Sequence, residues 1–508
     1  METQRIEADV LCVGGGIAGL MAAIRAGELG AKVVVADKSN TLHSGKGGCG
    51  NDHFLCYIPE VHSKDLDAVI EAMLETQQAD NFQGLGKNRI RVHMATSFDI
   101  VKLWDSWGIP MKYQGKWEFA GHGFPRDVLF MLKYQGLEQK KVLTKQALAR
   151  GVKIVNRVQV TDLLVNNRLI GAIGIGTRED RVVEFRAKSI VLGTGGVERL
   201  YPNPTPGLFR NRAYPQSQTG DGRIMAYRAG AELMGLEMPH FHAGPKYFAR
   251  SGQATWIGVY RDPQGKPIGP FVQKPDKKYG DVTPEVKKTV LADYEKSGRG
   301  PVYMDGNGVS DEDYDYMLFW MQHEGLQVLT NHMKEEGIDH RKRPVEFMTY
   351  DLGCRGRIVS NEKAETSLPG LYTAGDEVAN GISNAAIFGW LAGENAATYA
   401  KNIESPSPDE SGIKIAEKIN LIKSVRAHRD GPDWKEVNIA LNQIMHDYCW
   451  NIRSENLLNA GTGHLRRLKK RTYDTVVALN QHELGRCLEV YKLMDLGELV
   501  FFAAKERK

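Results

Sequence analysis

The feature of this sequence that most restricts its fold is a glycine turn between two short apolar runs near the N-terminus. Residues 8–13 have the composition of a buried strand, and Gly14-Gly15-Gly16-Ile17-Ala18-Gly19 follows at once. An Ala-rich helical pattern covers residues 20–29, and a second apolar strand, residues 32–36, ends in Asp37. This strand–helix–strand order within about 30 residues is the context in which the pattern G-x-G-x-x-G indicates dinucleotide binding.

Each glycine of this turn has a separate expected task. Gly14 permits the tight turn, Gly16 lets the backbone approach a pyrophosphate, and Gly19 allows the helix to pack closely on the sheet. The positive end of the helix that begins near Ile17 points at the phosphates. Asp37 stands where a carboxylate accepts ribose hydroxyls, and its charge would repel the 2′-phosphate of NADP. We therefore expect a dinucleotide other than NADP.

Further glycine turns favour FAD over NAD. Gly193-Thr194-Gly195-Gly196 and Ala374-Gly375-Asp376 both follow apolar runs, and Thr219-Gly220-Asp221-Gly222 opens a helical pattern. Any one of these turns is also typical of an ordinary loop, but together they suit an extended FAD molecule that contacts the ends of several strands. The residues that we predict to bind FAD are Gly14, Gly16, Ile17, Ala18, Gly19, Asp37, Lys38, Ser44, Gly45, Gly48, Gly50, Thr194, Gly195, Gly196, Thr219, Asp221, Gly375, Asp376, Ser383, Asn384 and Ala385.

The rest of the chain divides by composition and pattern. Residues 240–345 interrupt the alternation of strands and helices and are rich in Pro, Gly, Lys and Tyr, which indicates an inserted second domain. Long amphipathic segments follow a linker-like stretch at 405–409. We predict an FAD-binding domain in two parts (1–239 and 346–406), a capping domain (240–345) and a helical C-terminal domain (407–508). Apolar patterns also predict a small meander (158–165, 169–177 and 182–185), a parallel strand at 189–192, and helices at 434–450 and 463–479.

Composition and charge exclude several classes of protein. Hydrophobic residues make up 42% of the chain and charged residues 25%, which is typical of a globular protein and not of a disordered one. A net charge of only +4 does not indicate a nucleic-acid binder, so the basic run 466–471 is interpreted as a solvated or partner-docking face. No apolar stretch approaches about 18 residues, and the N-terminus lacks a signal-peptide pattern. We therefore expect a cytoplasmic protein that meets a membrane only through partners.

The six cysteines and 14 histidines show no metal-binding spacing. There is no C-x-x-C and no iron–sulfur pattern, and the histidines cluster no further than His240-Phe241-His242. We expect reduced thiols and no bound metal, so that any iron–sulfur cluster must belong to a separate chain.

The glycine blocks resemble those of a known family, the flavoprotein subunits of fumarate reductase, succinate dehydrogenase and adenylylsulfate reductase. The similar blocks extend over most of the chain and include residues 13–19, 194–196, 219–222, 367–376 and 388–393. Residues 298–305 look most like the alpha subunit of adenylylsulfate reductase. The resemblance implies an α/β fold: a Rossmann-like FAD-binding domain with an inserted capping domain and a C-terminal helical domain. It also implies an FAD-dependent oxidoreductase that exchanges electrons between a small-molecule substrate and a separate, ferredoxin-like iron–sulfur subunit.

The sequence departs from this family at the substrate-binding residues. Where fumarate reductases carry a His-x-Thr-x-Gly-Gly block, residues 349–354 read TYDLGC, without the histidine. Residues 380–386 read NGISNAA and lack the arginine that clamps a substrate carboxylate, so turnover of fumarate or succinate is not expected. The histidine that attaches flavin covalently in the family corresponds to Gly45, which predicts non-covalent FAD unless His43 is linked instead.

Similarity points to three candidates for proton transfer. His242 lies in the block that matches the family's Gln-Phe-His-Pro, and an imidazole exchanges protons near neutral pH. Arg250 and Arg261 follow at the start of the cap, where either could bind an anion or act as the proton-delivering arginine that fumarate reductases place there. For each of the three, a structural hydrogen bond or salt bridge is the alternative. Further pocket candidates are Asn51, Asp52 and His53, for which loop capping is the alternative, and His122 and Arg126.

Three functions remain open on the sequence alone. The leading hypothesis is the flavoprotein (alpha) subunit of an electron-transfer complex. The alternatives are a stand-alone enzyme similar to fumarate reductase or L-aspartate oxidase, and a non-catalytic subunit that relays electrons through FAD. The cap suggests a sulfur-oxyanion nucleotide as substrate, while an enoate or a carrier-bound acid also fits.

Overall fold

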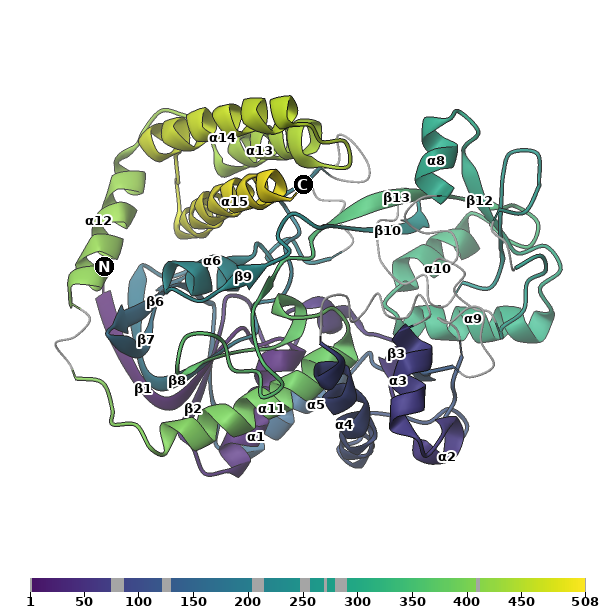
Figure 1. Ribbon diagram of the computed structural model, residues 1–508, viewed down its shortest axis with the longest axis horizontal. Coiled ribbons are helices and arrows are strands. Elements are labelled where there is room, and N and C mark those ends of the chain that lie inside the picture. The colour runs from purple at the N-terminus through teal and green to yellow at the C-terminus, as the bar shows by residue number, and fades with distance from the viewer. Residues whose placement is uncertain are drawn as a thin grey trace.

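The computed structural model describes residues 2–74, 86–120, 129–202, 214–246, 256–268, 272–278, 290–407 and 412–507, with the backbone alone for 2, 72–73, 241–243, 290, 292, 295 and 349–352. Figure 1 shows a layered α/β unit, a cap with its own sheet, and a group of C-terminal helices on the side of the α/β unit away from α1 and α11. No helix in these ranges combines the length and the apolar character needed to cross a membrane.

A seven-stranded sheet forms the centre of the α/β unit. Its order is β5-β2-β1-β8-β7-β6, with β15 beside β8. Strands β1, β2, β5, β8 and β15 are parallel, whereas β6 and β7 form an antiparallel hairpin next to β8. All residues of β2 are buried, as expected for a parallel strand covered on both faces. The bounds are β1 (Glu2–Val13), β2 (Val33–Asp37), β5 (Lys153–Asn156), β6 (Val158–Asn166), β7 (Arg168–Gly176), β8 (Arg181–Leu192) and β15 (Leu371–Thr373).

The strand prediction at the end of the meander needs one correction. The segments 182–185 and 189–192 are a single strand, β8, which continues from Arg181 to Leu192. Its first part pairs with β7 and its last part with β15. The polar residues between the two segments do not interrupt it, because β1 pairs with β8 along almost its whole length.

Helices cover both faces of this sheet (Figure 1). On one face, α1 (Ile17–Glu28) packs against α11 (Ile382–Ala400), and a Cβ atom on Gly393 would lie only 2.1 Å from the Ala22 carbonyl oxygen. The predicted helix at 463–479 corresponds to α14, which begins earlier, where the Ser454 side chain caps it, and ends earlier, at Thr475, because Val476 is extended. The other helices are α4 (Lys87–Ser106) and α5 (Gln139–Ala149) on the α1 side, and α6 (Asp221–Arg228), α12 (Gly412–Ala427), α13 (Trp434–Cys449), α14 (Glu455–Thr475) and α15 (Gln481–Glu506).

The cap is built on a four-stranded antiparallel sheet of order β10-β13-β12-β11. Its two neighbouring strands β10 (Pro239–Pro245) and β13 (Val345–Cys354) connect it to the α/β unit. Trp256, Met304 and Trp320 belong to a buried core of its own. The remaining cap elements are β11 (Val259–Arg261), β12 (Val302–Asp305), α8 (Val290–Lys296), α9 (Asp311–His323) and α10 (Gln327–Glu335).

Short elements join these parts. The pair β3 (His53–Leu55) and β4 (Met131–Lys133) matters most here, because β3 begins where the α/β unit meets the cap. The others are the pair β9 (Leu233–Met234) and β14 (Arg357–Ile358), helices α2 (Pro59–His62) and α3 (Leu66–Leu74), and the 3-10 turns η1 (Lys46–Cys49) and η4 (Gly375–Glu377).

Candidate functional site

Three predicted glycine turns meet at the carboxyl ends of β1, β8 and β15. Gly14 has φ +98°, and a Cβ atom on it would lie 2.4 Å from the Gly193 carbonyl oxygen of the second turn. A Cβ on Gly19 would lie 1.8 Å from the Gly14 carbonyl oxygen. These positions therefore accept only glycine, and the turns sit at the sheet edge where α/β folds bind ligands.

The start of α1 suits a pyrophosphate. Gly16 precedes this helix and Gly381 precedes α11, and neither offers a side chain that caps the first turn. Backbone N–H groups at such helix starts bind phosphate oxygens. The loop that begins at Gly45 comes close as well, since a Cβ on Gly45 would lie 3.4 Å from the Gly16 Cα. A dinucleotide phosphate fits this glycine-lined cradle.

Asp37 lies directly beside the first turn. Its carboxylate accepts hydrogen bonds from the Gly15 amide (2.7 Å), the Ser39 amide (2.7 Å) and the Ser44 hydroxyl (3.0 Å). The Lys140 ammonium donates to the Gly15 carbonyl oxygen. Burial lowers the pKa of Lys140 to about 7, with Asp37 opposing the shift. The predicted ribose-binding carboxylate is thus held in position at the turn.

Arg223 of α6 ties the second and third turns together. Its buried guanidinium donates to the carbonyl oxygens of Gly195 (2.9 Å), Asp376 (2.5 Å) and Gly356 (2.5 Å). Because these carbonyls come from distant segments, one side chain fixes their relative positions. No sequence pattern singles out Arg223 for this role.

Glu377 occupies the space between Thr194 and α6. Its carboxyl accepts from the Thr194 hydroxyl at 2.5 Å and from the Thr194 amide at 3.2 Å. A Cβ atom on Gly222 would lie 1.5 Å from this carboxyl. Burial raises the pKa of Glu377 to about 7. Glu377 follows the predicted Asp376 by one residue, yet only the tertiary structure reveals its burial.

Lys46 connects the glycine loop 45–50 with the third turn. Its Nζ lies 2.9 Å from Asp376 Oδ2, 3.2 Å from Glu198 Oε1 and 3.9 Å from the centre of the Tyr214 ring. Burial by itself would lower the pKa of Lys46, but Asp376 and Glu198 hold that pKa above its ordinary value. The predicted cofactor residue Asp376 is therefore anchored by the loop that carries Gly45, Gly48 and Gly50.

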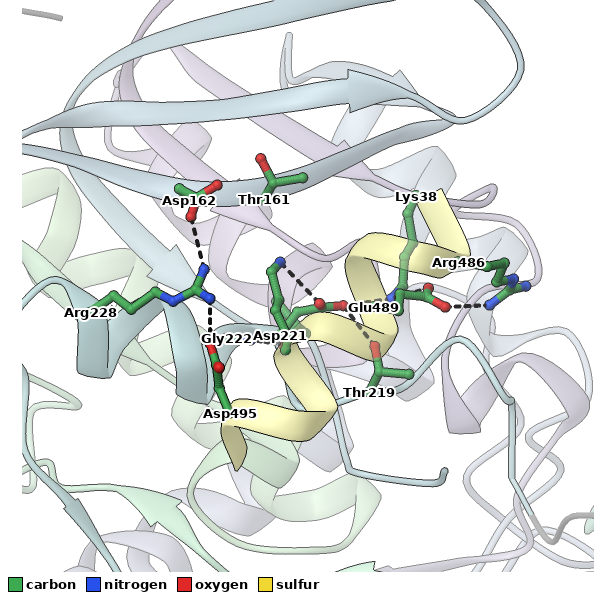
Figure 2. Close-up of polar contacts among 12 residues, drawn as sticks. Lys38, Thr161, Asp162, Thr219, Asp221, Gly222, Arg228, Arg486, Glu489 and Asp495 are labelled. Atoms are coloured by element: carbon green, nitrogen blue, oxygen red, sulfur yellow. Dashed lines mark hydrogen bonds and ion pairs between the residues drawn. The ribbon is translucent and has the colours of Figure 1, made fainter. Parts of the chain in front are cut away.

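Lys38 and Asp221, both predicted to bind the cofactor, are paired with each other. Lys38 Nζ lies 2.7 Å from Asp221 Oδ2, and the Thr219 hydroxyl donates to the same oxygen (Figure 2). Helix α15 completes the network through Lys492, 3.0 Å from Asp221, and Glu489, 3.0 Å from Lys38. These charges fasten α15 to the α/β unit, and a direct contact of either residue with the cofactor stays a prediction.

The first turn of α11 carries the predicted residues Ser383, Asn384 and Ala385, all buried. Asn384 Oδ1 lies 2.7 Å from His93 Nδ1, and burial lowers the pKa of His93 to about 4. The Asn380 amide nitrogen lies 3.3 Å from the His240 ring nitrogens. Contacts between amide and imidazole groups therefore lie in residues 380–386, the segment that corresponds to the substrate-clamping arginine of fumarate reductases.

Of the three predicted proton-transfer residues, the structure describes the side chain of Arg261 alone. Arg261 lies in β11, at the opposite edge of the cap sheet from β10, and its guanidinium contacts Asp305 (2.6 Å) and the Gly265 carbonyl oxygen (3.0 Å). These contacts favour the salt-bridge alternative for Arg261. His242 lies in β10 opposite Tyr350, but its side chain is outside the described part of the structure. Arg250, His122 and Arg126 also lie outside the described residues.

A different charged cluster lies where β3 meets the cap. Asp52, fully buried, contacts His53 Nδ1 at 2.7 Å and Lys133 Nζ at 2.5 Å, and its amide donates to Glu324 Oε2 at 2.9 Å. Burial by itself would raise the pKa of Asp52, but Lys133 and His53 hold that pKa well below its usual range. Of these residues the sequence pointed only to Asp52 and His53. Lys133 and Glu324 come from β4 and the cap, and no motif marks them.

The same cluster contains the ligand types of a metal site. Asp52, His53 and Glu324 each offer one ligand atom, all within 4.8 Å of one another. However, the Lys133 ammonium and the Asp52 amide already bind the two carboxylates. This arrangement favours a hydrogen-bonded acid–base cluster over a cation site.

Two family models match the chain. The model described as FAD binding domain covers residues 9–387, and the model described as fumarate reductase flavoprotein C-term covers residues 438–508.

Individual proteins of known name are similar over most of the chain. One subunit of the fumarate reductase (CoM/CoB) of Methanothermobacter marburgensis is 24% identical, over 98% of this chain and 91% of its own length. L-aspartate oxidase of Yersinia pestis is 24% identical, over 77% of this chain and 73% of its own. The structure of adenylylsulfate reductase from Archaeoglobus fulgidus aligns with a TM-score of 0.85 at 19% identity, covering 100% of this chain and 90% of that one.

Proposed function

The chain belongs to the FAD binding domain family, as an FAD-dependent flavoprotein of the fumarate reductase and adenylylsulfate reductase type, and from this premise we propose that it serves an electron-transfer complex. In that complex a substrate reacts at FAD, and a separate iron–sulfur protein exchanges the electrons. Family membership confirms the predicted α/β fold, the FAD cofactor and the oxidoreductase class. FAD supplies two-electron transfer when bound, and the convergence of three glycine turns at one sheet edge is the observation that carries the proposal.

The cysteines support an iron–sulfur cluster outside this chain. Cys12, Cys56, Cys354, Cys449 and Cys487 are buried, and burial raises the pKa of each thiol. Iron–sulfur clusters are held by several cysteines at characteristic spacings, and the six cysteines of this sequence show no such spacing. We therefore propose that the partner protein supplies the cysteines that hold the iron–sulfur cluster.

Helix α14 offers a docking face for that partner. Arg466, Arg467, Lys470 and Arg471 are exposed on it. Opposite charge steers partners together and sets their orientation. We propose that an acidic, ferredoxin-like protein binds this face.

We propose that the substrate is not a dicarboxylate held by an arginine of residues 380–386. Asn380 and Asn384 contact His240 and His93 in the segment where the clamp would lie. Loss of a bidentate arginine removes the main charge partner of a carboxylate. We propose a substrate with a polarised double bond or a sulfur oxyanion that needs no such clamp.

The test is anaerobic purification of the native protein with measurement of flavin, iron and acid-labile sulfide. Stoichiometric iron and sulfide in a second polypeptide would support the proposal. A single chain that contains flavin alone and turns over with oxygen would contradict it and would favour a stand-alone enzyme similar to L-aspartate oxidase.

A further inference from the structure

The charged cluster at β3 occupies a position between the cofactor turns and the cap. The loop 45–50 starts against Gly16 and ends at Gly50, where a Cβ atom would lie 2.3 Å from the His323 carbonyl oxygen of the cap. His53 follows three residues later. On its other side, β3 contacts the α11 start through His93, which lies 3.3 Å from the Leu55 carbonyl oxygen and 2.7 Å from Asn384. The strand that begins with His53 therefore lies between residues assigned to FAD and the cap.

The contacts of His53 are those of an imidazole prepared for proton transfer. Its Nδ1 lies 2.7 Å from Asp52 Oδ1, and Asp52 is held ionised by Lys133 at 2.5 Å. A buried carboxylate on Nδ1 sets the orientation of the ring and stabilises the imidazolium. With Nδ1 engaged in this way, the proton exchanged during a reaction is the one on Nε2.

The cap contributes the remaining part of the cluster. Glu324 follows α9, accepts from the Asp52 amide, and lies 3.8 Å from His53 Nδ1. Asp52 and Glu324 are 272 positions apart in the chain and belong to the α/β unit and the cap, respectively. Their contact therefore exists only when the cap lies on the α/β unit. Closure of the cap thus adds a second carboxylate beside His53.

We propose that His53 is an acid–base residue of the flavin site, and that Asp52 and the cap residue Glu324 are its positioning residues. This assignment rests on the proposed function and names a proton donor other than the sequence candidates His242, Arg250 and Arg261.

The step balances in the direction of substrate reduction. The two-electron reduced form of FAD would supply the hydride for one atom of a polarised double bond, and the His53 imidazolium would give the proton on Nε2 to the other atom. His53 would then be neutral and regain its proton from water, while two electrons from the iron–sulfur partner and one further proton from water would restore the reduced cofactor.

Sulfite tests this without knowledge of the substrate, because it adds to the flavin and places negative charge over the ring. The full-length FAD-loaded protein is titrated with sulfite from about pH 6 to 9, a range that spans histidine ionisation, and loss of oxidised flavin absorbance gives Kd. Each variant is expressed as a ratio of its Kd to the wild-type Kd, so the ionisation of sulfite itself cancels. The titratable groups around His53 are Asp52 and Glu324, which lie beside its Nδ1, Lys133, which pairs with Asp52, and His323, which interacts electrostatically with Asp52.

The expected result for His53→Gln is a Kd ratio of about tenfold or more at low pH that falls toward 1 at high pH, since a full imidazolium charge is lost. In Glu324→Gln and Asp52→Asn the wild-type transition should move to lower pH, because a carboxylate that favours the imidazolium is gone. His464→Gln, an exposed histidine of α14, is the matched control and should give a ratio of 1 throughout.

A ratio for His53→Gln that does not change with pH would overturn the proposal. If His53→Gln loses FAD, the Glu324→Gln variant alone tests the proposal, because its substitution lies in the cap. A sulfite-binding transition at the same pH as in wild type would then count against the proposal. Neither sulfite readout involves an iron–sulfur partner. Failure of the partner proposal would appear as a native protein that consists of a single chain, whereas failure of the His53 proposal would appear in the sulfite titrations.

Discussion

The Lys38 ammonium lies 2.7 Å from the Asp221 carboxylate, although 183 residues separate the two in the chain. On α15, Glu489 also pairs with Lys38 (Figure 2), and Lys492 pairs with Asp221. All four side chains are largely buried, so losing one charge would leave its buried partners with fewer opposite charges or none. The C-terminal helices are therefore attached to the FAD-binding unit by charge as well as by apolar packing.

Replacement Asp221→Asn should lower the free energy of unfolding by about 3–5 kcal/mol, because it leaves Lys492 as a buried cation without its paired carboxylate and leaves Lys38 with Glu489 alone. Urea denaturation of the FAD-loaded protein measures the change. The control is Asp99→Asn, which breaks an exposed pair with Lys102 and should change the free energy by less than about 1 kcal/mol. Equal effects of the two substitutions would show that the network is not a stabilising connection.

The same network predicts sensitivity to acid. Lys38 and Lys492 hold the pKa of Asp221 below its ordinary value although burial opposes ionisation. The stability from this depressed pKa is present above the unfolded pKa of about 4 and is lost as the pH falls toward the folded value. Thermal unfolding between about pH 7 and pH 3 should show a decline in wild type that is reduced in Asp221→Asn. A parallel decline in both proteins would contradict the assignment.

Glu377 predicts a pH dependence of opposite sign. Its pKa is raised from 4.5 to about 7 by burial, so its stabilising contribution is complete below about pH 4.5 and is lost as the pH rises through about 7. In Glu377→Gln the free energy of unfolding should lose this decline, a difference on the order of 3 kcal/mol between the two ends of the range. Urea titrations at about pH 4.5 and pH 8 measure it. If the free energy of unfolding declines between about pH 4.5 and pH 8 as much in Glu377→Gln as in wild type, Glu377 does not titrate in the folded protein.

Replacement Gly19→Ala should abolish FAD retention, because the new methyl group would lie 1.8 Å from the Gly14 carbonyl oxygen and distort the phosphate-binding turn. The flavin-to-protein absorbance ratio after gel filtration gives the readout. Gly463→Ala in α14 is the matched control; it should keep FAD and stabilise the helix by up to about 1 kcal/mol. Full FAD content in Gly19→Ala would exclude this turn as the cofactor site.

Charge reversal on α14 should weaken binding of the iron–sulfur partner. The double variant Arg466→Glu, Arg467→Glu is expected to bind at least about tenfold more weakly at low salt, with the difference shrinking as ionic strength rises. Lys414→Glu with Lys423→Glu on α12 makes the same change in net charge and should leave the affinity unaltered. Co-purification and binding measurements at two salt concentrations decide between them. Equal losses in both double variants would place the docking face elsewhere.

Local patterns predicted the cofactor turns well and the acid–base cluster poorly. Residues 14–19 lie within one strand–turn–helix unit, so neighbouring residues reveal their roles. The break expected between 182–185 and 189–192 was wrong, because pairing with β1 keeps β8 continuous. Lys133 and Glu324 escaped notice because each becomes significant only through contact with Asp52.

The sequence by itself determined the dinucleotide-binding unit, the FAD-type arrangement of glycine turns and the helical character of the C-terminal part. Glycine geometry and hydrophobic periodicity act over a few residues and can be read without the rest of the chain. Only the tertiary structure decided that Lys38 and Asp221 pair with α15, that Arg261 is engaged within the cap, and that His53 meets Asp52, Lys133 and Glu324. Such contacts join segments far apart in the chain, and their strength depends on burial that the folded molecule alone creates.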